Sequence, residues 1–204
     1  MKPFTRHEGV AVPMDALNVD TDQILPARYL RKRKADPDYH LYLFHDLRFD
    51  ADGAERPDFI LNQPAWRGAT VIVGNENFGG GSSREAAAFA LDAYGMRCVI
   101  APSFGDIFFS NCLKNGILPV RTSNEACARL RKILHARPGA KLSIDLEAQT
   151  VTDPEGGVLS FDLDSFAKRN LMKGLSPIGL TMEHDAEIAA FEKAYAARAP
   201  WAAL

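Results

Sequence analysis

The middle of the chain alternates short apolar runs with helix-like segments. Three apolar runs have the length of buried strands, at 69–73, 98–102 and 117–120. Two segments between them have the composition of helices, at 86–91 and at 103–115, the second with Ser103 as its expected N-cap. Gly95 and Gly116 follow these helices, where a glycine C-cap is common. This order with short links predicts a parallel sheet with right-handed crossovers.

The segments around this unit extend the same pattern. Residues 9–14 are expected to form a short strand, followed by an Asx-rich turn at 18–22, and residues 31–64 to form loops and short helices. An amphipathic helix is predicted over 124–136. Its apolar face consists of Ala126, Leu130, Ile133 and Leu134.

The remainder of the chain is predicted to contain a β-hairpin and two closing helices. Alternating apolar residues at 142–146 are expected to pair with 158–163 across a turn at 153–157. The helices are expected over 166–173 and 185–197. On the last helix, Ile188, Phe191 and Tyr195 are interpreted as core positions rather than as a surface for a partner.

Length and composition favour a folded domain with small molecules or proteins as partners. At 204 residues with 47% hydrophobic content, the chain can bury a core, and we expect a single domain over residues 1–204. A net charge of −2, from 24 basic and 26 acidic residues, gives no positive field for nucleic acid or an acidic membrane surface. No segment reaches the roughly 20 apolar residues of a membrane span, and the first residues lack the apolar core of a signal peptide.

Cysteine usage indicates a reducing compartment, and the cytoplasm fits best. The chain has three cysteines, Cys98, Cys112 and Cys127, with no C-x-x-C spacing. An odd number without paired spacing suggests neither a disulfide framework nor a self-sufficient zinc or iron–sulfur site. We therefore expect this chain to bind no metal of its own.

The segment 77–85 carries the strongest chemical signal. It places three glycines at 79–81 between an expected strand and an expected helix, and Ser82, Ser83 and Arg84 follow. Glycines allow φ > 0 and a close approach of the backbone to a ligand, and a helix N-terminus favours a carboxylate or phosphate. Arg84 adds a guanidinium fork that matches a carboxylate. The segment is therefore typical of an anion site with a candidate nucleophile or base.

A structural interpretation of the same residues competes with the anion site. Ser82 and Glu85 have the spacing of a capping box, in which Ser82 is the N-cap and Glu85 reaches back to it. Nucleotide loops are a poor match. The P-loop lysine is missing, and Arg84 stands where the last glycine of the dinucleotide pattern would be.

Ordered motifs along nearly the whole chain resemble the small subunits of isopropylmalate dehydratase, which correspond to the swivelling fourth domain of aconitase. The motifs lie at 18–26, 77–85, 100–108, 115–120 and 178–181. The resemblance implies an α/β fold of the swivelling β/β/α type, with a central, partly parallel sheet.

The resemblance also implies a reaction and a partner. Members of this family isomerise 2-isopropylmalate to 3-isopropylmalate by loss and return of water, in leucine biosynthesis. The work is divided between two chains, and the larger of the two holds a [4Fe–4S] cluster. On this resemblance the present chain is active only with a large subunit and binds no cofactor itself.

Carried over by position, the resemblance assigns roles to five residues. Ser82 is the base, acting as an alkoxide, and Ser83 and Arg84 bind the substrate carboxylate. Asp22 matches an acid near the site in aconitases, with a surface Asx turn as its structural alternative. Arg31 follows a Tyr-Leu pair, lies over the substrate side chain, and helps to select the malate derivative.

Two departures from the family pattern leave alternatives open. The family usually has cysteine where Gly80 stands and histidine where Ala86 stands. Loss of the histidine removes a polar group beside Glu85 and bears on the substrate more than on the reaction. One alternative is a related hydro-lyase subunit for another substituted malate, such as citramalate or dimethylmalate. The other is a non-catalytic binding or regulatory partner.

Overall fold

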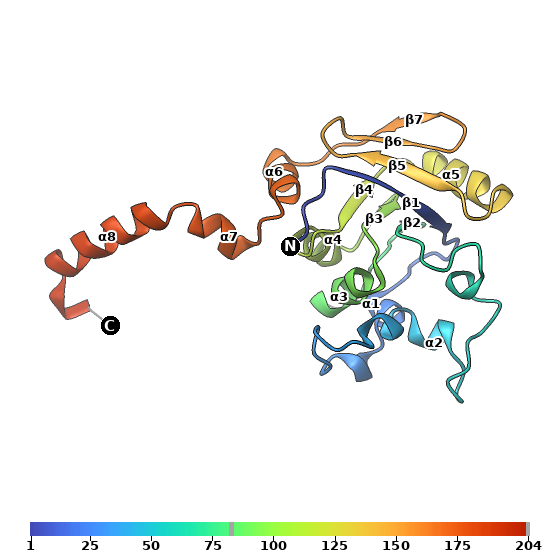
Figure 1. The fold of residues 1–204 in the computed structure, drawn as a ribbon, viewed down its shortest axis with the longest axis horizontal. Helices are drawn as coiled ribbons and strands as arrows, with labels where there is room; N and C mark the ends of the chain where they lie inside the picture. Colours follow the sequence, from blue (N-terminus) through green and yellow to red (C-terminus); the bar gives the residue numbers. More distant parts are fainter. Residues whose placement is uncertain (82–83, 203–204) are drawn as a thin grey trace.

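Buried apolar strands form one half of a seven-stranded mixed sheet. In the computed structural model, which describes residues 1–81 and 84–202, the strand order is β4-β3-β2-β1-β5-β6-β7 (Figure 1). Their bounds are β1 (Arg6–Pro13), β2 (Val71–Val73), β3 (Cys98–Ala101), β4 (Leu118–Arg121), β5 (Lys141–Asp145), β6 (Thr150–Thr152) and β7 (Val158–Ser160). The strands β1 to β4 are parallel, whereas β1–β5, β5–β6 and β6–β7 are antiparallel pairs. The prediction of a partly parallel sheet is confirmed.

Helices fill the connections, mostly where the apolar pattern predicts them. The α-helices are α1 (Thr21–Ile24), α2 (His45–Arg48), α3 (Glu85–Tyr94), α4 (Asp106–Lys114), α5 (Asn124–Ala136), α6 (Ser165–Lys173), α7 (Pro177–Met182) and α8 (Asp185–Arg198). Short 3-10 helices are η1 (Ala27–Tyr29), η2 (Tyr39–Tyr42), η3 (Ile60–Asn62) and η4 (Pro200–Ala202). The amphipathic helix over 124–136 is confirmed at both ends, and the segment 31–64 consists of loops and short helices, as predicted.

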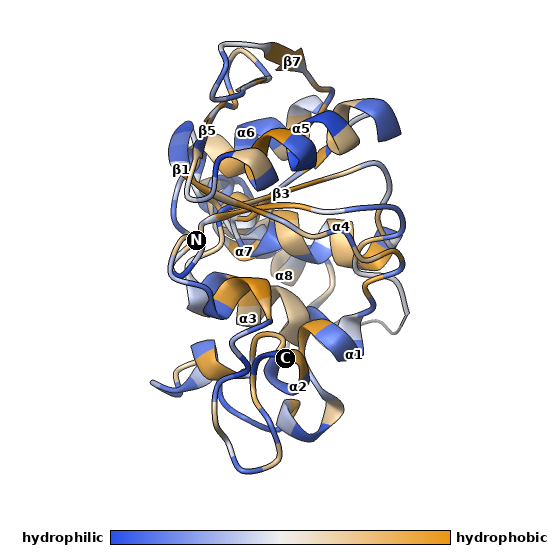
Figure 2. Cartoon of the chain, turned by 90° about the vertical axis from the view of Figure 1, so that its right-hand side faces the viewer, coloured by the Kyte–Doolittle hydropathy of each residue, from blue (hydrophilic) through white to orange (hydrophobic). Residues whose placement is uncertain are grey.

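Helices cover both faces of the parallel half, which explains why its strands are continuous apolar runs. Successive side chains of a strand point to opposite faces. Ile72 therefore packs with α3 and α4, whereas Val71 and Val73 pack with α5. Figure 2 shows the apolar strands between α5 on one side and α3 and α4 on the other.

The ends of the two crossover helices only partly follow the prediction. The helix α3 ends at Gly95 with φ +102°, which confirms the glycine C-cap, and Gly116 follows α4 with φ +79°. The expected N-cap Ser103 is wrong, because α4 begins after Gly105. The Ser103 hydroxyl instead accepts the backbone N–H of Asn77 at 2.8 Å, so a neighbouring loop occupies the group that would have capped the helix.

The predicted pairing of 142–146 with 158–163 is wrong. β5 pairs with β6 and β6 pairs with β7, so an unpredicted strand lies between the two predicted ones. This strand has a single buried apolar residue, Val151, and is too short to show a period in the sequence. The turn at 153–157 therefore closes the hairpin between β6 and β7.

The interpretation of Ile188, Phe191 and Tyr195 as core residues is also wrong. The helices α7 and α8 extend away from the sheet (Figure 1), and no residue of α8, all of which are described, is buried. Phe191 is 64% exposed and Tyr195 is 39% exposed. The predicted helix forms, but its apolar stripe faces solvent. Within the described residues, no helix is long and apolar enough to cross a membrane.

One buried carboxylate organises the turn between β6 and β7. The side chain of Asp153 accepts the backbone N–H groups of Glu155 at 2.8 Å and Gly157 at 2.9 Å, and the Arg129 guanidinium donates to it at 2.7 Å. Burial alone would raise the pKa of Asp153, but these donors outweigh burial and the pKa lies below its ordinary value.

Replacing this carboxylate by an amide tests the turn. We expect Asp153→Asn to lower the free energy of unfolding at neutral pH by about 1–3 kcal/mol, because buried donors lose a charged acceptor. A depressed folded pKa contributes stability that is complete above the unfolded value of about 3.9 and is lost as the pH falls through the folded value. The gap between wild type and variant should therefore narrow in acid. Denaturant unfolding at neutral and acid pH measures it, and a gap independent of pH would contradict the account.

Candidate functional site

Three loops meet at the carboxyl ends of the parallel strands. They follow β1, β2 and β3 and contain the Asx-rich turn at 18–22, the Gly-rich segment at 77–85, and residues 102–105. In open α/β sheets this edge is where ligands bind. Motifs that are far apart in the sequence thus lie at one place.

Backbone hydrogen bonds join the Gly-rich segment to the loop after β1. The N–H of Gly79 donates to the carbonyl of Val19 at 2.6 Å, and the N–H of Thr21 donates to the carbonyl of Gly80 at 2.9 Å. Backbone bonds of this kind fix the spacing of two chain segments without depending on side-chain rotamers. The Gly-rich segment is therefore held beside the first turn of α1.

The same segment is bound on its other side by the loop after β3. Phe78 donates its N–H to the carbonyl of Ser103 at 3.0 Å, and Gly105 donates its N–H to the carbonyl of Phe78 at 3.1 Å. The bond from Asn77 to the Ser103 hydroxyl adds a third link. The Gly-rich segment is the middle of three joined loops.

Two glycines are required by this packing rather than by a ligand. Gly79 has φ +72°, and a Cβ there would lie 2.2 Å from the ring of Phe108. A Cβ on Gly105 would lie 2.4 Å from the carbonyl oxygen of Gly79. Gly80, where the family usually has cysteine, is less constrained, because its Cβ would approach only the side-chain amide of Asn77, at 3.0 Å.

An ion pair connects the Gly-rich segment to α1. The Nη1 of Arg84 donates to Oδ1 of Asp22, with Arg84 mostly buried and Asp22 half exposed. Among the described residues no other group is hydrogen-bonded to the Arg84 guanidinium, so its remaining donors are open to a carboxylate. The structure thus brings together two of the predicted site residues, Asp22 and Arg84.

The turn that carries Asp22 is a capped helix start. The carboxylate of Asp20 accepts the N–H of Gln23 at 2.7 Å, and the side chain of Gln23 accepts the N–H of Asp20 at 3.1 Å. This capping box holds Asp22 in the first turn of α1. Its signal is present in the sequence as Asp20-x-x-Gln23, which the interpretation as an Asx-rich turn overlooks.

The capping box predicted for α3 is not formed. The N-cap of α3 is Arg84, with extended backbone (φ −129°, ψ 103°) and no side-chain cap. Glu85 is the first helical residue, and its carboxylate accepts the side-chain N–H of Asn115 at 3.0 Å. Ser82 and Ser83 lie outside the described residues, so their roles as base and carboxylate ligand stay predictions.

Arg31 is not in contact with the ion pair. It lies just after η1 and lines a hollow of about 400 Å³ whose other walls are residues of the same segment, Lys32, Arg33, Ala35 and Asp36. Among the described residues its guanidinium has no hydrogen-bond or ion-pair partner. The structure therefore leaves Arg31 exposed and available to a ligand or a partner chain.

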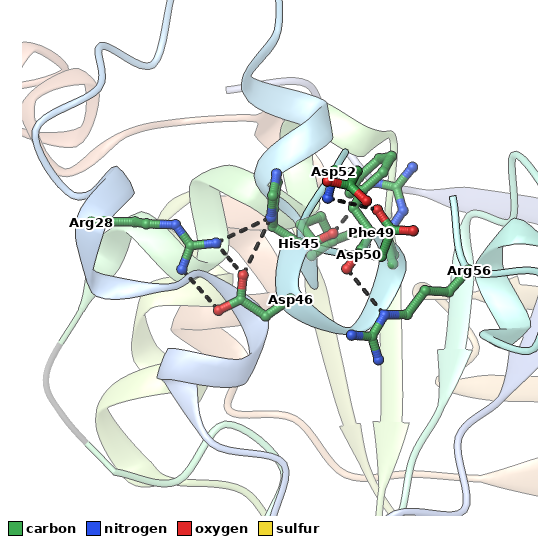
Figure 3. Close-up of polar contacts among 9 residues, drawn as sticks. Arg28, His45, Asp46, Phe49, Asp50, Asp52 and Arg56 are labelled. Atoms are coloured by element: carbon green, nitrogen blue, oxygen red, sulfur yellow. Dashed lines mark hydrogen bonds and ion pairs between the residues drawn. The ribbon is translucent and has the colours of Figure 1, made fainter. Parts of the chain in front are cut away.

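The segment that carries Arg31 is fixed at both ends. Arg28 donates to Asp46, as Figure 3 shows, and the Asp46 carboxylate raises the pKa of Arg28 while Arg28 lowers that of Asp46. At the other end, Lys34 pairs with Asp92 of α3 at 3.1 Å. The exposed residues between these anchors are thereby tied to the helix that follows the Gly-rich segment.

The three thiols do not fit an iron–sulfur cluster. Cys98, Cys112 and Cys127 are completely buried on β3, α4 and α5. Burial raises the pKa of the Cys98 and Cys112 thiols and raises that of Cys127 to about 11. Cluster ligation requires thiolates. Within residues 1–81 and 84–202, no three His, Cys, Asp or Glu side chains gather as a metal site.

Comparison with known proteins decides the family. The family described as aconitase C-terminal domain matches residues 1–125, LeuD_N matches 128–165, and the C-terminal domain of the 3-isopropylmalate dehydratase small subunit matches 178–203. A 3-isopropylmalate dehydratase small subunit from Roseobacter denitrificans is 50% identical over 201 residues, covering 98% of this chain and 100% of that protein. One from Mesorhizobium japonicum is 48% identical over 202 residues, covering 99% and 100%. The chain belongs to the 3-isopropylmalate dehydratase small-subunit family.

Membership in the 3-isopropylmalate dehydratase small-subunit family confirms the predicted function class, a hydro-lyase subunit that works with a large subunit. A solved structure of 3-isopropylmalate dehydratase (leuD) from Methanocaldococcus jannaschii has the same fold, with a TM-score of 0.66 at 24% identity over 91% of this chain and 98% of that chain. The departures at Gly80 and Ala86 thus occur within this family.

Two glycine variants separate backbone strain from loop packing. Gly79 and Gly53 both have positive φ, but a Cβ on Gly53 would meet nothing within 4 Å. Each Gly→Ala change should cost about 1–2 kcal/mol for the left-handed backbone. Gly79→Ala should cost about 1–3 kcal/mol more, because it displaces the ring of Phe108.

Denaturant unfolding of both variants, with activity in the presence of the large subunit, tests this difference. Gly79→Ala should also lower activity, because the loop that carries Arg84 is displaced, whereas Gly53→Ala should not. Equal losses of stability in the two variants would show that the packing of the Gly-rich segment is not the constraint.

Proposed function

We propose that the edge formed by the three loops is the face that this chain contributes to the active site of 3-isopropylmalate dehydratase. The enzyme isomerises 2-isopropylmalate to 3-isopropylmalate by dehydration and rehydration. The observation that carries the proposal is the Arg84–Asp22 pair at the carboxyl ends of the parallel strands. The names of the full-length relatives supply the substrate.

In this proposal Arg84 binds a substrate carboxylate. One of its N–H groups is engaged by Asp22, which orients the guanidinium, and the others are free to form a second, charge-assisted pair. The N-terminus of α3, which begins directly after Arg84, adds a favourable field for the anion. Ser83, adjacent in the sequence, supplies a further hydrogen bond to the same carboxylate.

Ser82 acts as the base in this proposal. Its alkoxide takes the proton from the carbon beside the carboxylate, and the electron pair of that C–H bond forms the double bond as the hydroxyl leaves the neighbouring carbon. A serine hydroxyl is a very weak acid, so nearby positive charge and exclusion of water must favour the alkoxide. Arg84 and the start of α3 are the positive groups adjacent to it in the sequence.

The partner in this proposal is the large subunit, which closes the site from the other side. The buried thiols of this chain do not fit a cluster, so we assign the [4Fe–4S] cluster expected of the family to the large subunit. The residues of this chain then account for proton transfer and carboxylate binding, and not for departure of the hydroxyl.

Two serine variants test the assignment of the base. In the complex with the large subunit, Ser82→Ala should lower kcat by roughly 10²–10⁴-fold, with KM largely unchanged because Arg84 still binds the carboxylate. Ser83→Ala should raise KM more than it lowers kcat. The measurement is anaerobic kinetics of both variants, corrected for folded fraction. A folded Ser82→Ala complex with near wild-type turnover would remove Ser82 from the chemical step.

A second pair of variants tests the role of Arg31 in selecting the substrate. Arg31→Val should change the ranking of kcat/KM among 2-isopropylmalate, citramalate and dimethylmalate. Arg33 is a matched control, since it is exposed on the same hollow and likewise has no described side-chain partner. Arg33→Val should leave the ranking unchanged. If both variants rank the malates as wild type does, this segment plays no part in specificity.

A further inference from the structure

The C-terminal arm, residues 177–202, exposes more large apolar side chains than any other stretch of similar length among the described residues. It comprises α7, α8 and η4 and projects from the body of the protein (Figure 1). Its exposed apolar residues are Ile178, Met182, Phe191, Tyr195 and Trp201, the last 83% exposed. Contiguous exposed apolar surface of this kind marks an interaction site.

The apolar residues of α8 have the spacing of a docking helix. Ile188, Phe191 and Tyr195 occupy positions i, i+3 and i+7, and the rings of Phe191 and Tyr195 stack with centroids 5.7 Å apart. Helices that bind in a groove of a partner present anchors at this spacing, and aromatic side chains are frequent hot spots in interfaces. The stripe therefore fits a groove on another molecule.

The helix α8 also lacks support within the chain. It has 14 residues, and isolated helices shorter than about 12–15 residues are marginal in water. In proteins, most helix stability comes from packing of an apolar face, and the α8 face has no buried residue. A stable α8 thus calls for a surface outside this chain.

The base of the arm continues this surface onto the body. An apolar groove of about 450 Å³ lies where α6 and α7 meet α4, lined by Met1, Leu113, Phe166, Leu175 and Leu180. The side-chain oxygen of Asn170 is buried beside it and has no hydrogen-bond partner among the described residues. A donor from a partner chain would satisfy this acceptor.

The charges of α8 argue against a membrane as the partner. The helix carries Asp185, Glu187 and Glu192 against Lys193 and Arg198, which gives three acidic and two basic side chains. Helices that lie on membranes are rich in Lys and Arg on the polar face. A protein surface is the better match.

We infer that the C-terminal arm docks the large subunit. The aconitase C-terminal domain family ends at residue 125 of this chain, whereas the family described as specific to the small subunit covers 178–203, which is the arm. A domain on a separate chain has no covalent link to its partner, and a second contact away from the active site raises the effective concentration of the two halves. The inference rests on the proposed function, which makes the large subunit the partner.

A stripe variant and a matched control test the docking. Phe191→Gln with Tyr195→Gln removes the two aromatic anchors with a residue that favours helix. Ala186→Gln with Ala197→Gln places the same residues on the opposite, exposed side of α8. The affinity for the large subunit is measured anaerobically by titrating activity against the concentration of this chain and by sedimentation, and far-UV dichroism checks the fold.

The stripe variant should raise the Kd for the large subunit roughly 30-fold or more, with kcat at saturation unchanged, and the control should bind as wild type does. Wild-type affinity of the stripe variant overturns the inference. So does dimerisation of the isolated wild-type chain that the stripe variant abolishes, since a second copy would then be the occupant. If the wild-type pair binds tightly through the stripe but does not convert isopropylmalate, the docking stands and the proposed function fails.

Discussion

The candidate site depends on the backbone hydrogen bonds that join the Gly-rich segment to the loops on both sides of it. These bonds set Arg84 beside Asp22, although the two residues are 62 positions apart in the sequence. Their geometry requires glycine at 79 and 105, where a side chain would collide with Phe108 or with the Gly79 carbonyl. The glycines thus serve to bring loops together, and the anion site is a consequence of how the loops pack.

The sheet makes this convergence possible. Parallel strands place the loops that follow them at one edge, so three consecutive βα connections bring separate motifs to one place. The antiparallel half, β5 to β7, adds no residue to the candidate site. Its own stability has a separate origin, in the Asp153 carboxylate and the cluster under α5. Changes in that half should affect folding more than catalysis.

The parallel half could be predicted from sequence because its strands are continuous apolar runs and its helices end at glycines. The third antiparallel strand could not, because Thr150–Thr152 offers a single apolar residue and no period. Periodicity also identified α8 as a helix but gave the wrong environment for Phe191, since the same stripe serves a core or a partner. For the site, motif resemblance brought Asp22 and Arg84 together, whereas the helix start at Glu85 depends on tertiary contacts that the capping pattern does not encode. That residues 1–204 form a single domain stays a prediction.

The most direct test of the account is a double-mutant cycle on the Arg84–Asp22 pair. The complex with the large subunit would be assayed with Asp22→Asn, with Arg84→Lys and with both changes, comparing kcat/KM for isopropylmalate. If Asp22 acts by orienting the Arg84 guanidinium, the two effects should be coupled by about 0.5–3 kcal/mol, so that the second change costs much less once the first is made. Strictly additive effects would mean that the two side chains act independently, and the proposed arrangement of the site would be incorrect.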